Sequence, residues 1–137
     1  MICLKFFFSS FNFKTDGEIQ FIDITDQIQE IVEKSKIHQG MVFVFSPHAT
    51  GAIILNENDQ PLLDDFRDLL ERLIPKSGSY RHPINAHSHL RSIFMEPSKA
   101  IPVKDGKLAL GTWQSIIWVE VDTRPRTRTV MVTVLGD

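Results

Sequence analysis

The chain has 137 residues, of which 42% are hydrophobic and 23% charged, as in an ordinary globular domain. Its net charge of −2 gives no electrostatic reason to expect nucleic acid as a partner, and its single cysteine, Cys3, excludes an internal disulfide. No stretch reaches the roughly 18 apolar residues of a membrane-spanning helix, and no signal-peptide cleavage site follows the apolar N-terminus, so we expect a cytoplasmic protein with no membrane partner.

The first half of the chain predicts four strands with one helix between the second and the third. The first strand contains Cys3 and is expected to be buried, and an Asp-Gly hairpin turn follows it. The helix begins near Ile24 with Asp23 or Thr25 as N-cap, and Gly40 suits its end. The third strand is a continuous apolar run and is also expected to be buried. The expected strands are residues 2–13, 18–23, 41–45 and 51–55.

The second half predicts two helices and four strands. The clearer helix carries an apolar stripe from Leu62 to Leu73, with one proline before the stripe and another after it. A shorter helix is expected at 86–94, with Asn85 as its cap. Strands are expected at 100–103, 108–110, 115–121 and 129–135. Because strands and helices cluster rather than alternate, residues 1–137 are predicted to form one α+β domain with a largely antiparallel sheet and two to three helices.

Four of the five histidines lie between residues 48 and 89, in segments that also hold acids, amides and hydroxyls. Imidazole is a common metal ligand and titrates near neutral pH. His48, His82 and one of His87 or His89 could supply the three ligands of a catalytic divalent metal, zinc or magnesium. If 86–94 is helical, His87 and His89 point in different directions and only one of them can face the site. Loop histidines with ordinary hydrogen bonds are the alternative.

Acidic side chains near these histidines are the candidate bases. Glu57 follows Asn56 at the end of an apolar strand, where a carboxylate can be a base, a metal ligand or a cap for the next helix. Asp64 and Asp65 lie in the first turn of that helix, where the helix dipole favours negative charge. Asp65 lies beside the apolar stripe and is the better candidate to reach a site, whereas Asp64 is expected to be solvated.

Aromatic and basic side chains complete the set of candidates. Trp113 and Gln114 join two strands and could stack on and orient a planar ring, or the tryptophan could cover a core edge or a subunit contact. Arg81 and Arg91 flank the histidines and could bind phosphate. Three further arginines in a turn are expected to form a solvated rim; they are Arg124, Arg126 and Arg128.

Together these motifs resemble those of the YjbQ family, also known as UPF0047. They are His48-x-Thr50, Asn56-Glu57, Leu62–Phe66, Asn85–Leu90 and Gly106–Gln114, and they extend over nearly the full chain. The resemblance implies a small α+β sandwich that assembles as a homotrimer around a threefold axis. It also implies a secondary thiamine-phosphate synthase activity, which joins a pyrimidine methyl diphosphate to a thiazole phosphate and releases pyrophosphate, normally with magnesium.

The resemblance also ranks the candidate residues. His87 is matched in only part of the family and ranks below His89, whereas His38 lies outside the motifs. The polar positions that match are His48, Thr50, Asn56, Glu57, Asp65, His82, His89, Trp113 and Gln114.

Two functional hypotheses follow. In the first, the protein is an enzyme for a small-molecule substrate: a thiamine-phosphate synthase-like transferase, or a metal-dependent hydrolase of a small phosphorylated substrate. Its catalytic residues would be His48, Glu57, Asp65, His82 and His89, with His48, His82 and His89 as metal ligands. Its ligand-binding residues would be Thr50, Asn56, Arg81, Arg91, Trp113 and Gln114. In the second, the trimer binds a metal or ligand without catalysis.

Overall fold

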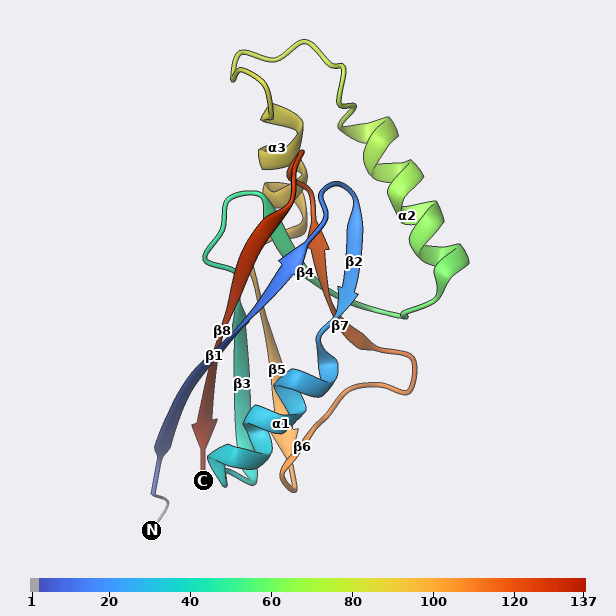
Figure 1. The fold of residues 1–137 in the computed structure, drawn as a ribbon. Helices are drawn as coiled ribbons and strands as arrows, with labels where there is room; N and C mark the ends of the chain where they lie inside the picture. Colours follow the sequence, from blue (N-terminus) through green and yellow to red (C-terminus); the bar gives the residue numbers. More distant parts are fainter. Residues whose placement is uncertain (1–2) are drawn as a thin grey trace.

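The computed structural model describes residues 3–137, which form eight strands and three helices (Figure 1). The strands are β1 (Lys5–Thr15), β2 (Gln20–Asp23), β3 (Gln39–Phe45), β4 (Gly51–Asn56), β5 (Ser98–Lys104), β6 (Lys107–Leu108), β7 (Ser115–Glu120) and β8 (Arg126–Gly136). The helices are α1 (Thr25–Ser35), α2 (Gln60–Leu73) and α3 (Ala86–Met95). Every strand pairing within the described residues is antiparallel, so the predicted α+β class is confirmed.

The strands form two sheets with apolar side chains packed between them. One sheet has the strand order β1-β8-β3-β5-β6 and the other has the order β2-β7-β4. Figure 1 shows α1 across the lower part of the molecule and α2 and α3 toward its upper part. The main core joins α1 to strands of both sheets and includes Ile28, Val32, Val44, Trp118 and Val132. A second cluster, on the other face of the three-stranded sheet, includes Ala52, Leu70, Met95 and Val119.

The ladder between β4 and β7 defines the two ends of the three-stranded sheet. Gly51 pairs with Glu120 at one end, and Asn56 pairs with Ser115 at the other. Because β4 has six residues, the two ends lie about 17 Å apart along the strand. After β7 the chain crosses to the five-stranded sheet and returns as β8, so residues 121–125 join the two sheets at the Glu120 end.

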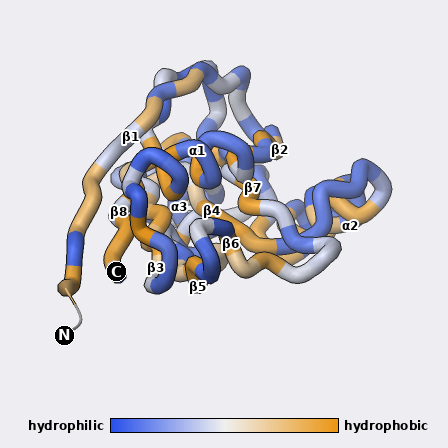
Figure 2. The backbone as a smooth tube through the Cα atoms, turned by 90° about the horizontal axis from the view of Figure 1, so that it is seen from below, coloured by the Kyte–Doolittle hydropathy of each residue, from blue (hydrophilic) through white to orange (hydrophobic). Residues whose placement is uncertain are grey.

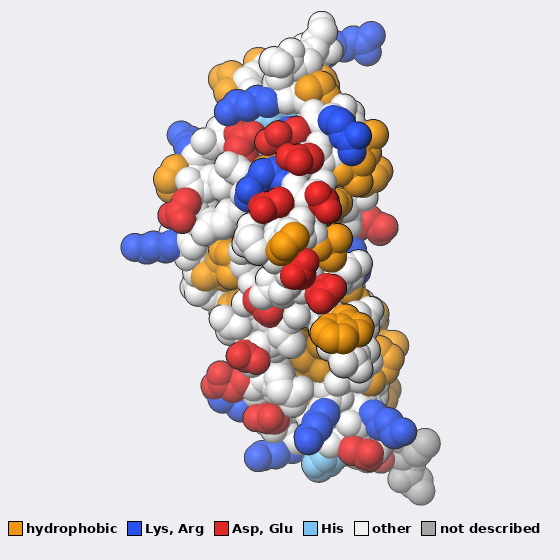
Figure 3. Space-filling model, turned by 90° about the vertical axis from the view of Figure 1, so that its right-hand side faces the viewer, with side chains coloured by type: hydrophobic (Ala, Val, Ile, Leu, Met, Phe, Trp, Pro, Cys, Tyr) orange, Lys and Arg blue, Asp and Glu red, His pale blue; other side chains and the backbone are white. Residues whose placement is uncertain are grey.

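Helix α2 begins and ends where the sequence predicts. The Asp59 carboxylate accepts a hydrogen bond from the Leu62 N–H, Pro61 lies in the first turn, and the helix ends at Leu73, two residues before Pro75. Figure 1 shows α2 standing to one side of the sheets. Acidic side chains gather over the face of the molecule on which this helix lies (Figure 3).

Two segments predicted to be buried are exposed. Cys3 is exposed and precedes β1, and residue 2, which the first predicted strand included, lies outside the described residues. In β3, Met41, Phe43 and Phe45 are exposed and only the alternate positions face the core. The physical reason is that β3 lies in a sheet with one covered face, so the period of two along the strand sends every second side chain outward. Figure 2 shows hydrophobic positions (orange) along β1, in which exposed and half-buried side chains alternate in the same way.

Helix α1 ends earlier than predicted. Lys36 adopts a left-handed conformation with φ of 60° and closes the helix after Ser35. Gly40 lies instead in β3, where a Cβ atom would come within 2.0 Å of the Leu135 carbonyl oxygen. This glycine is therefore explained by the close approach of β8. No helix within residues 3–137 is long and apolar enough to cross a membrane.

Candidate functional site

Two of the predicted site histidines, His82 and His89, lie together at the N-terminal end of α3. Their ring centroids are 4.8 Å apart, with the ring planes at 72°. His82 comes from the loop that leads to α3, and His89 comes from the first turns of that helix. They line an open cleft of about 590 Å³, together with Ser79, Tyr80, Arg81, Ala86 and Leu90.

This cleft suits an anion. Its lining contains one arginine and two imidazoles and no carboxylate. Ala86, the first residue of α3, also lines it, so the positive end of that helix dipole lies at the cleft. We name this set of side chains, Arg81, His82 and His89, the anion cleft.

A hydrogen bond fixes the proton position on His82. Its Nε2 lies 3.2 Å from the Oδ1 atom of Asn85, which can only accept. His82 Nε2 must therefore carry a hydrogen, and in the neutral ring Nδ1 is left as the acceptor that can meet a ligand. The Asn85 amide lies on its other side against Asp122, with Nδ2 donating to Oδ1 at 3.5 Å. Asn85 therefore orients His82; it occupies the predicted N-cap position of α3, but its side chain makes no cap hydrogen bond.

Asp122 is a buried carboxylate that stays ionised. Burial alone would raise the pKa of Asp122, but hydrogen bonds from the Thr123 N–H, Arg126, Thr50 and Asn85 lower it from 3.8 to about 2. The Thr123 N–H lowers it most, at 2.7 Å from the Oδ1 atom, and Arg126 follows with Nη2 2.8 Å and Nε 3.0 Å from the Oδ2 atom. The series of hydrogen bonds that runs from Asp122 through Asn85 to His82 therefore begins at a fixed negative charge.

The lowered pKa of Asp122 predicts acid sensitivity. A carboxyl whose pKa is lower when folded than when unfolded adds stability above the unfolded value of 3.8, and the stability is lost as the pH falls toward 2. We expect Asp122 to contribute about 2 kcal/mol to the free energy of unfolding at pH 5. Urea unfolding of the wild type and of Asp122→Asn should show a difference that shrinks from pH 5 downward. A difference independent of pH would contradict the assignment.

A buried ion pair lies next to Asp122 and joins the two sheets. Arg128 donates from Nε to Glu120 Oε1 at 2.7 Å and from Nη2 to Oε2 at 2.5 Å, and the two residues are 4% and 0% exposed. Arg128 also donates to the Thr50 hydroxyl, and Thr15 donates to Glu120. The predicted solvated rim is therefore wrong for Arg128, which is buried and paired, and for Arg126, which binds Asp122. It holds for Arg124, which is exposed.

His48 lies near enough to this ion pair to feel its charges. Its ring lies edge-on to Trp118 with centroids 5.9 Å apart, and burial together with the charge of Arg128 lowers the pKa of His48. The Thr129 N–H donates to Nε2 at 2.9 Å, which requires that nitrogen to be unprotonated. His48 is therefore a neutral hydrogen-bond acceptor within the fold, and its Nε2 is not free to bind a metal.

The predicted three-histidine metal site is not formed within the described chain. Residues 3–137 contain no group of three or more histidine, cysteine, aspartate or glutamate side chains placed to hold a metal ion. His82 and His89 lie side by side, but the Nε2 atom of His48 accepts a hydrogen bond from the Thr129 N–H. These residues therefore do not fit the zinc or magnesium site expected from the sequence.

Two other candidates, His87 and Arg91, belong to a buried cluster on the opposite side of α3. His87 Nε2 lies 2.8 Å from Glu18 Oε1, Arg91 Nε donates to the Ile74 carbonyl at 3.0 Å, and both side chains are 1% exposed. The same glutamate lies 3.3 Å from the Lys76 ammonium. This cluster ties α3 to the turn before β2 and to the loop after α2. Arg91 was predicted to bind phosphate, but it is buried and does not line the anion cleft.

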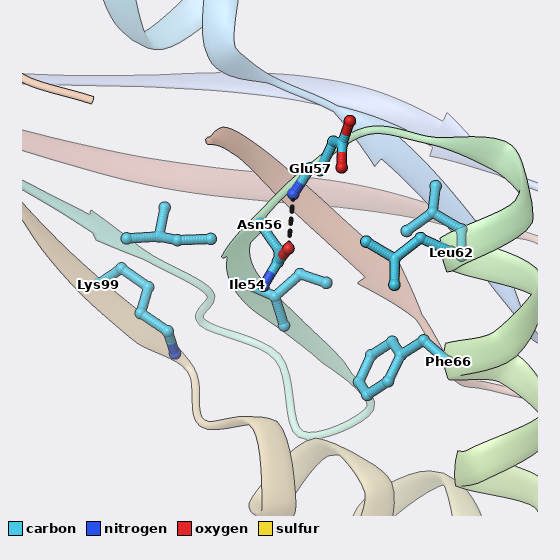
Figure 4. A pocket seen from close by; sticks show the side chains of 8 residues that line it. Ile54, Asn56, Glu57, Leu62, Phe66 and Lys99 are labelled. Atoms are coloured by element: carbon cyan, nitrogen blue, oxygen red, sulfur yellow. Dashed lines mark hydrogen bonds between the residues drawn. The ribbon is translucent and has the colours of Figure 1, made fainter. Parts of the chain in front are cut away.

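The remaining candidates lie at the far end of the three-stranded sheet. Asn56 and Glu57 line a pocket between β4 and α2 (Figure 4). Because Asn56 pairs with Ser115, the segment just before β7 lies at the same end of the sheet. Trp113 in that segment is 72% exposed, so it does not cover a core edge in the isolated chain. Gln114 accepts a hydrogen bond from the Gly111 N–H at 2.8 Å and shapes the turn.

Asp65 is separate from both groups. It is exposed on α2 and faces a shallow surface shared with Asp68, Glu71 and Arg72 of the same helix. The predicted site residues thus fall into four places in one chain: the anion cleft with His48 and Thr50 near it, the buried cluster that holds Arg91, the Asn56 end of the sheet, and the outer face of α2.

The acidic and basic side chains whose hydrogen bonds support the anion cleft were not predicted from the sequence as site residues. Glu120 and Asp122 are two residues apart near the end of β7, and Arg126 and Arg128 are two residues apart in β8. Alternate residues of a strand share a face, so each pair could have been placed on one side of its strand. The missing information was that β7 and β8 belong to different sheets and meet at their ends.

Comparison with known proteins agrees with this fold. A family model described as UPF0047 protein YjbQ-like matches residues 9–137. A UPF0047 protein of Archaeoglobus fulgidus is 42% identical over 125 residues, which cover 89% of this chain and 96% of that protein. UPF0047 protein YugU of Bacillus subtilis is 33% identical over 129 residues, which cover 90% of this chain and 95% of that protein.

Solved structures with the same fold also come from this family. The crystal structure of a YbjQ-like protein of unknown function from Sulfolobus solfataricus P2 superposes with a TM-score of 0.95 at 36% identity, covering 98% of this chain and all of that one. An uncharacterised conserved protein of the yjbq/upf0047 family from Clostridium acetobutylicum gives a TM-score of 0.88 at 38% identity, covering 92% of this chain and 98% of the other. The chain therefore belongs to the YjbQ (UPF0047) family.

Proposed function

We propose that the protein is a transferase that binds a small phosphorylated substrate in the anion cleft and displaces pyrophosphate from it. The observation that carries the proposal is the cleft itself, where Arg81, His82 and His89 meet the N-terminus of α3 with no carboxylate in the lining. A diphosphate leaving group gains negative charge as its bond to carbon breaks, and arginine, imidazole and helix N–H groups stabilise that charge.

The reaction that fits best resembles thiamine-phosphate synthesis. The carbon–oxygen bond between a pyrimidine methylene group and its diphosphate breaks, and a bond forms from that methylene carbon to the nitrogen of a thiazole phosphate. Pyrophosphate leaves with the electron pair of the broken bond. His89, and His82 when its Nδ1 also carries a proton, would donate hydrogen bonds to the departing oxygens, and Asn85 orients the His82 ring. Because the described residues offer no three-ligand metal site, we assign no step to a protein-bound metal.

We further propose that the active form is a homotrimer in which the outer face of the five-stranded sheet is covered by other copies. That face carries a patch of large apolar side chains on neighbouring strands, with Phe6 59%, Phe8 72% and Phe43 43% exposed. Soluble monomers rarely leave such a contiguous patch in water. Its other exposed members are Met41, Phe45 and Met131.

A charge in this patch should dissociate the trimer. We expect Phe43→Lys, at the centre of the sheet, to convert the wild-type species of three chain masses into a folded monomer, because burying an unpaired ammonium is strongly unfavourable. Analytical ultracentrifugation measures the mass, and circular dichroism checks the fold. Lys34→Ala, at an exposed position of α1, which packs against the opposite face of this sheet, is the control. A wild type that sediments as a monomer would contradict the trimer.

A trimer would also bring together two groups of predicted site residues that lie apart in one chain. The anion cleft and the Asn56–Glu57 end of the sheet are separated by the length of β4 in one chain. In a cyclic trimer each chain meets its neighbours through two different surfaces. We therefore place Glu57 and Trp113 of one copy opposite the anion cleft of the next.

The catalytic proposal is tested by pyrophosphate release. With a pyrimidine methyl diphosphate and a thiazole phosphate as substrates, the wild type should release pyrophosphate and form the condensed product. Arg81→Ala should lower kcat/KM by about 100-fold, because it removes a charge-assisted contact to the leaving group. Arg124→Ala, an exposed arginine outside the cleft, should leave the rate unchanged. Wild-type protein without turnover, but with pyrophosphate binding, would indicate a non-catalytic ligand-binding trimer instead.

A further inference from the structure

The pocket between β4 and α2 has the shape of a binding site for a ring. It has a volume of about 340 Å³. Figure 4 shows Leu62 and Phe66 pointing from α2 toward Ile54 and Asn56 of β4, so the apolar walls face each other across the space. Leu55 and Leu63 complete these walls. A slot with two apolar sides favours a flat apolar body.

Two polar groups lie at one end of this slot. The Asn56 Oδ1 atom accepts a hydrogen bond from the Glu57 N–H at 2.8 Å, so the Asn56 amide has its Nδ2 donors left for a ligand. The half-buried Glu57 carboxylate has no hydrogen bond or ion pair among the contacts within residues 3–137. Figure 4 shows the Glu57 carboxylate pointing away from the Asn56 amide, so Asn56 supplies the free donor of this slot.

The third polar residue, Lys99 of β5, contributes its stem rather than its charge. In Figure 4 it lies on the side of the pocket away from α2. Its ammonium donates to the Met95 carbonyl at 2.9 Å, at the end of α3. Burial lowers the pKa of Lys99, although nearby Glu96 opposes the effect. The methylene groups of this side chain therefore extend the apolar wall, and the amine is already bonded.

We propose that this pocket binds a small flat ring that carries a hydrogen-bond acceptor. The acceptor, a carbonyl or ring nitrogen, meets the Asn56 amide. The ring fills the slot between Ile54 and Phe66. The inference rests on the proposed function in one respect, since it assigns this pocket to the ring portion of the substrate whose diphosphate occupies a neighbour's anion cleft.

Benzamide is a suitable probe because it joins a flat ring to a carbonyl acceptor. We expect the methyl signals of Ile54, Leu62 and Leu63 to shift on titration of the full-length protein, followed by ¹³C-methyl NMR. Leu62→Trp fills the slot and should weaken binding about tenfold or more. Leu69→Trp is the matched control on the same helix: the two leucines are 38% and 36% exposed, and Leu69 does not line the pocket.

A second variant separates the polar contacts from the packing. Asn56→Leu keeps the side-chain size but removes the donors, and it should weaken benzamide about tenfold while leaving toluene binding unchanged. Methyl shifts that are absent, that lie outside the pocket, or that respond equally to Leu62→Trp and Leu69→Trp would overturn the inference. The benzamide titration needs no anion. It can therefore fail while pyrophosphate still binds at Arg81 and His82, or succeed where pyrophosphate does not bind.

Discussion

Replacing Arg128 with alanine should lower the free energy of unfolding by about 3–5 kcal/mol, the largest stability effect expected in this fold. The Glu120 carboxylate is fully buried and receives two hydrogen bonds from Arg128. Without the guanidinium it keeps only the Thr15 hydroxyl and the Asp122 N–H as donors. Because a buried charge without its partner is costly, we expect the midpoint of thermal unfolding to fall by roughly 10 °C or more. Scanning calorimetry at one fixed protein concentration measures both quantities.

Two further variants test that the lost partner causes the effect. Arg124→Ala removes an exposed arginine from the preceding turn and should change stability by less than about 0.5 kcal/mol. The double variant Glu120→Leu with Arg128→Met removes both charges and should recover part of the loss, because apolar replacements of a buried pair are often tolerated. If the double variant were less stable than Arg128→Ala, the ion pair would not be the reason for the loss.

The second large effect concerns catalysis across copies of the chain. His89→Ala and Glu57→Ala should each lower turnover by at least about 100-fold when assayed alone, because each removes a group from the proposed site. If the site is shared between copies, trimers assembled from an equal mixture of the two variants should recover about one quarter of the wild-type rate. One interface in four then joins an intact His89 to an intact Glu57, if the chains assort at random.

The mixing experiment distinguishes a shared site from a site within one chain. A site contained in one chain would lack either His89 or Glu57 in every copy, and the mixture would remain inactive. Mass spectrometry of the intact trimers confirms that mixed species have formed. An inactive mixture with confirmed mixed trimers would contradict the shared site. The anion cleft within one chain is tested separately by pyrophosphate binding.

Much of the fold follows from local pattern in the sequence. The Asp59 cap, Pro61 and the leucine stripe define α2 closely because each acts over a few residues. The exposed face of β3 could not be predicted in the same way. Met41, Phe43 and Phe45 look like core residues, and their exposure depends on which faces of the sheet the helices leave uncovered.

The candidate site was only partly predictable for a similar reason. His82 and His89 are seven residues apart, so the loop and the start of α3 bring them together locally. His48, by contrast, depends on contacts with Arg128 and Thr129, which lie 80 and 81 residues further along the chain. Spacing in the sequence carries no information about such a contact. It therefore could not show that the His48 ring is already bonded.

Supporting residues were the hardest to predict. Asn85 fits the pattern of a helix cap, yet its amide lies between Asp122 and His82. Arg126 and Arg128 fit the pattern of a basic surface turn, yet both bind carboxylates at the junction of the sheets. In each case local preference and tertiary contact compete for the same side chain, and the tertiary contact decides its role.

The anion cleft is tested most directly by pyrophosphate binding observed at the histidine rings. In ¹⁵N NMR of selectively labelled protein, titration with pyrophosphate should shift the ring signals of His82 and His89 together, with one common dissociation constant. The ring of His38, which is exposed and remote from the cleft, should not respond. Arg81→Ala should weaken the binding at least tenfold. Ring signals of His82 and His89 that stay unchanged at saturating pyrophosphate, or that move no more than those of His38, would contradict the assignment of this cleft.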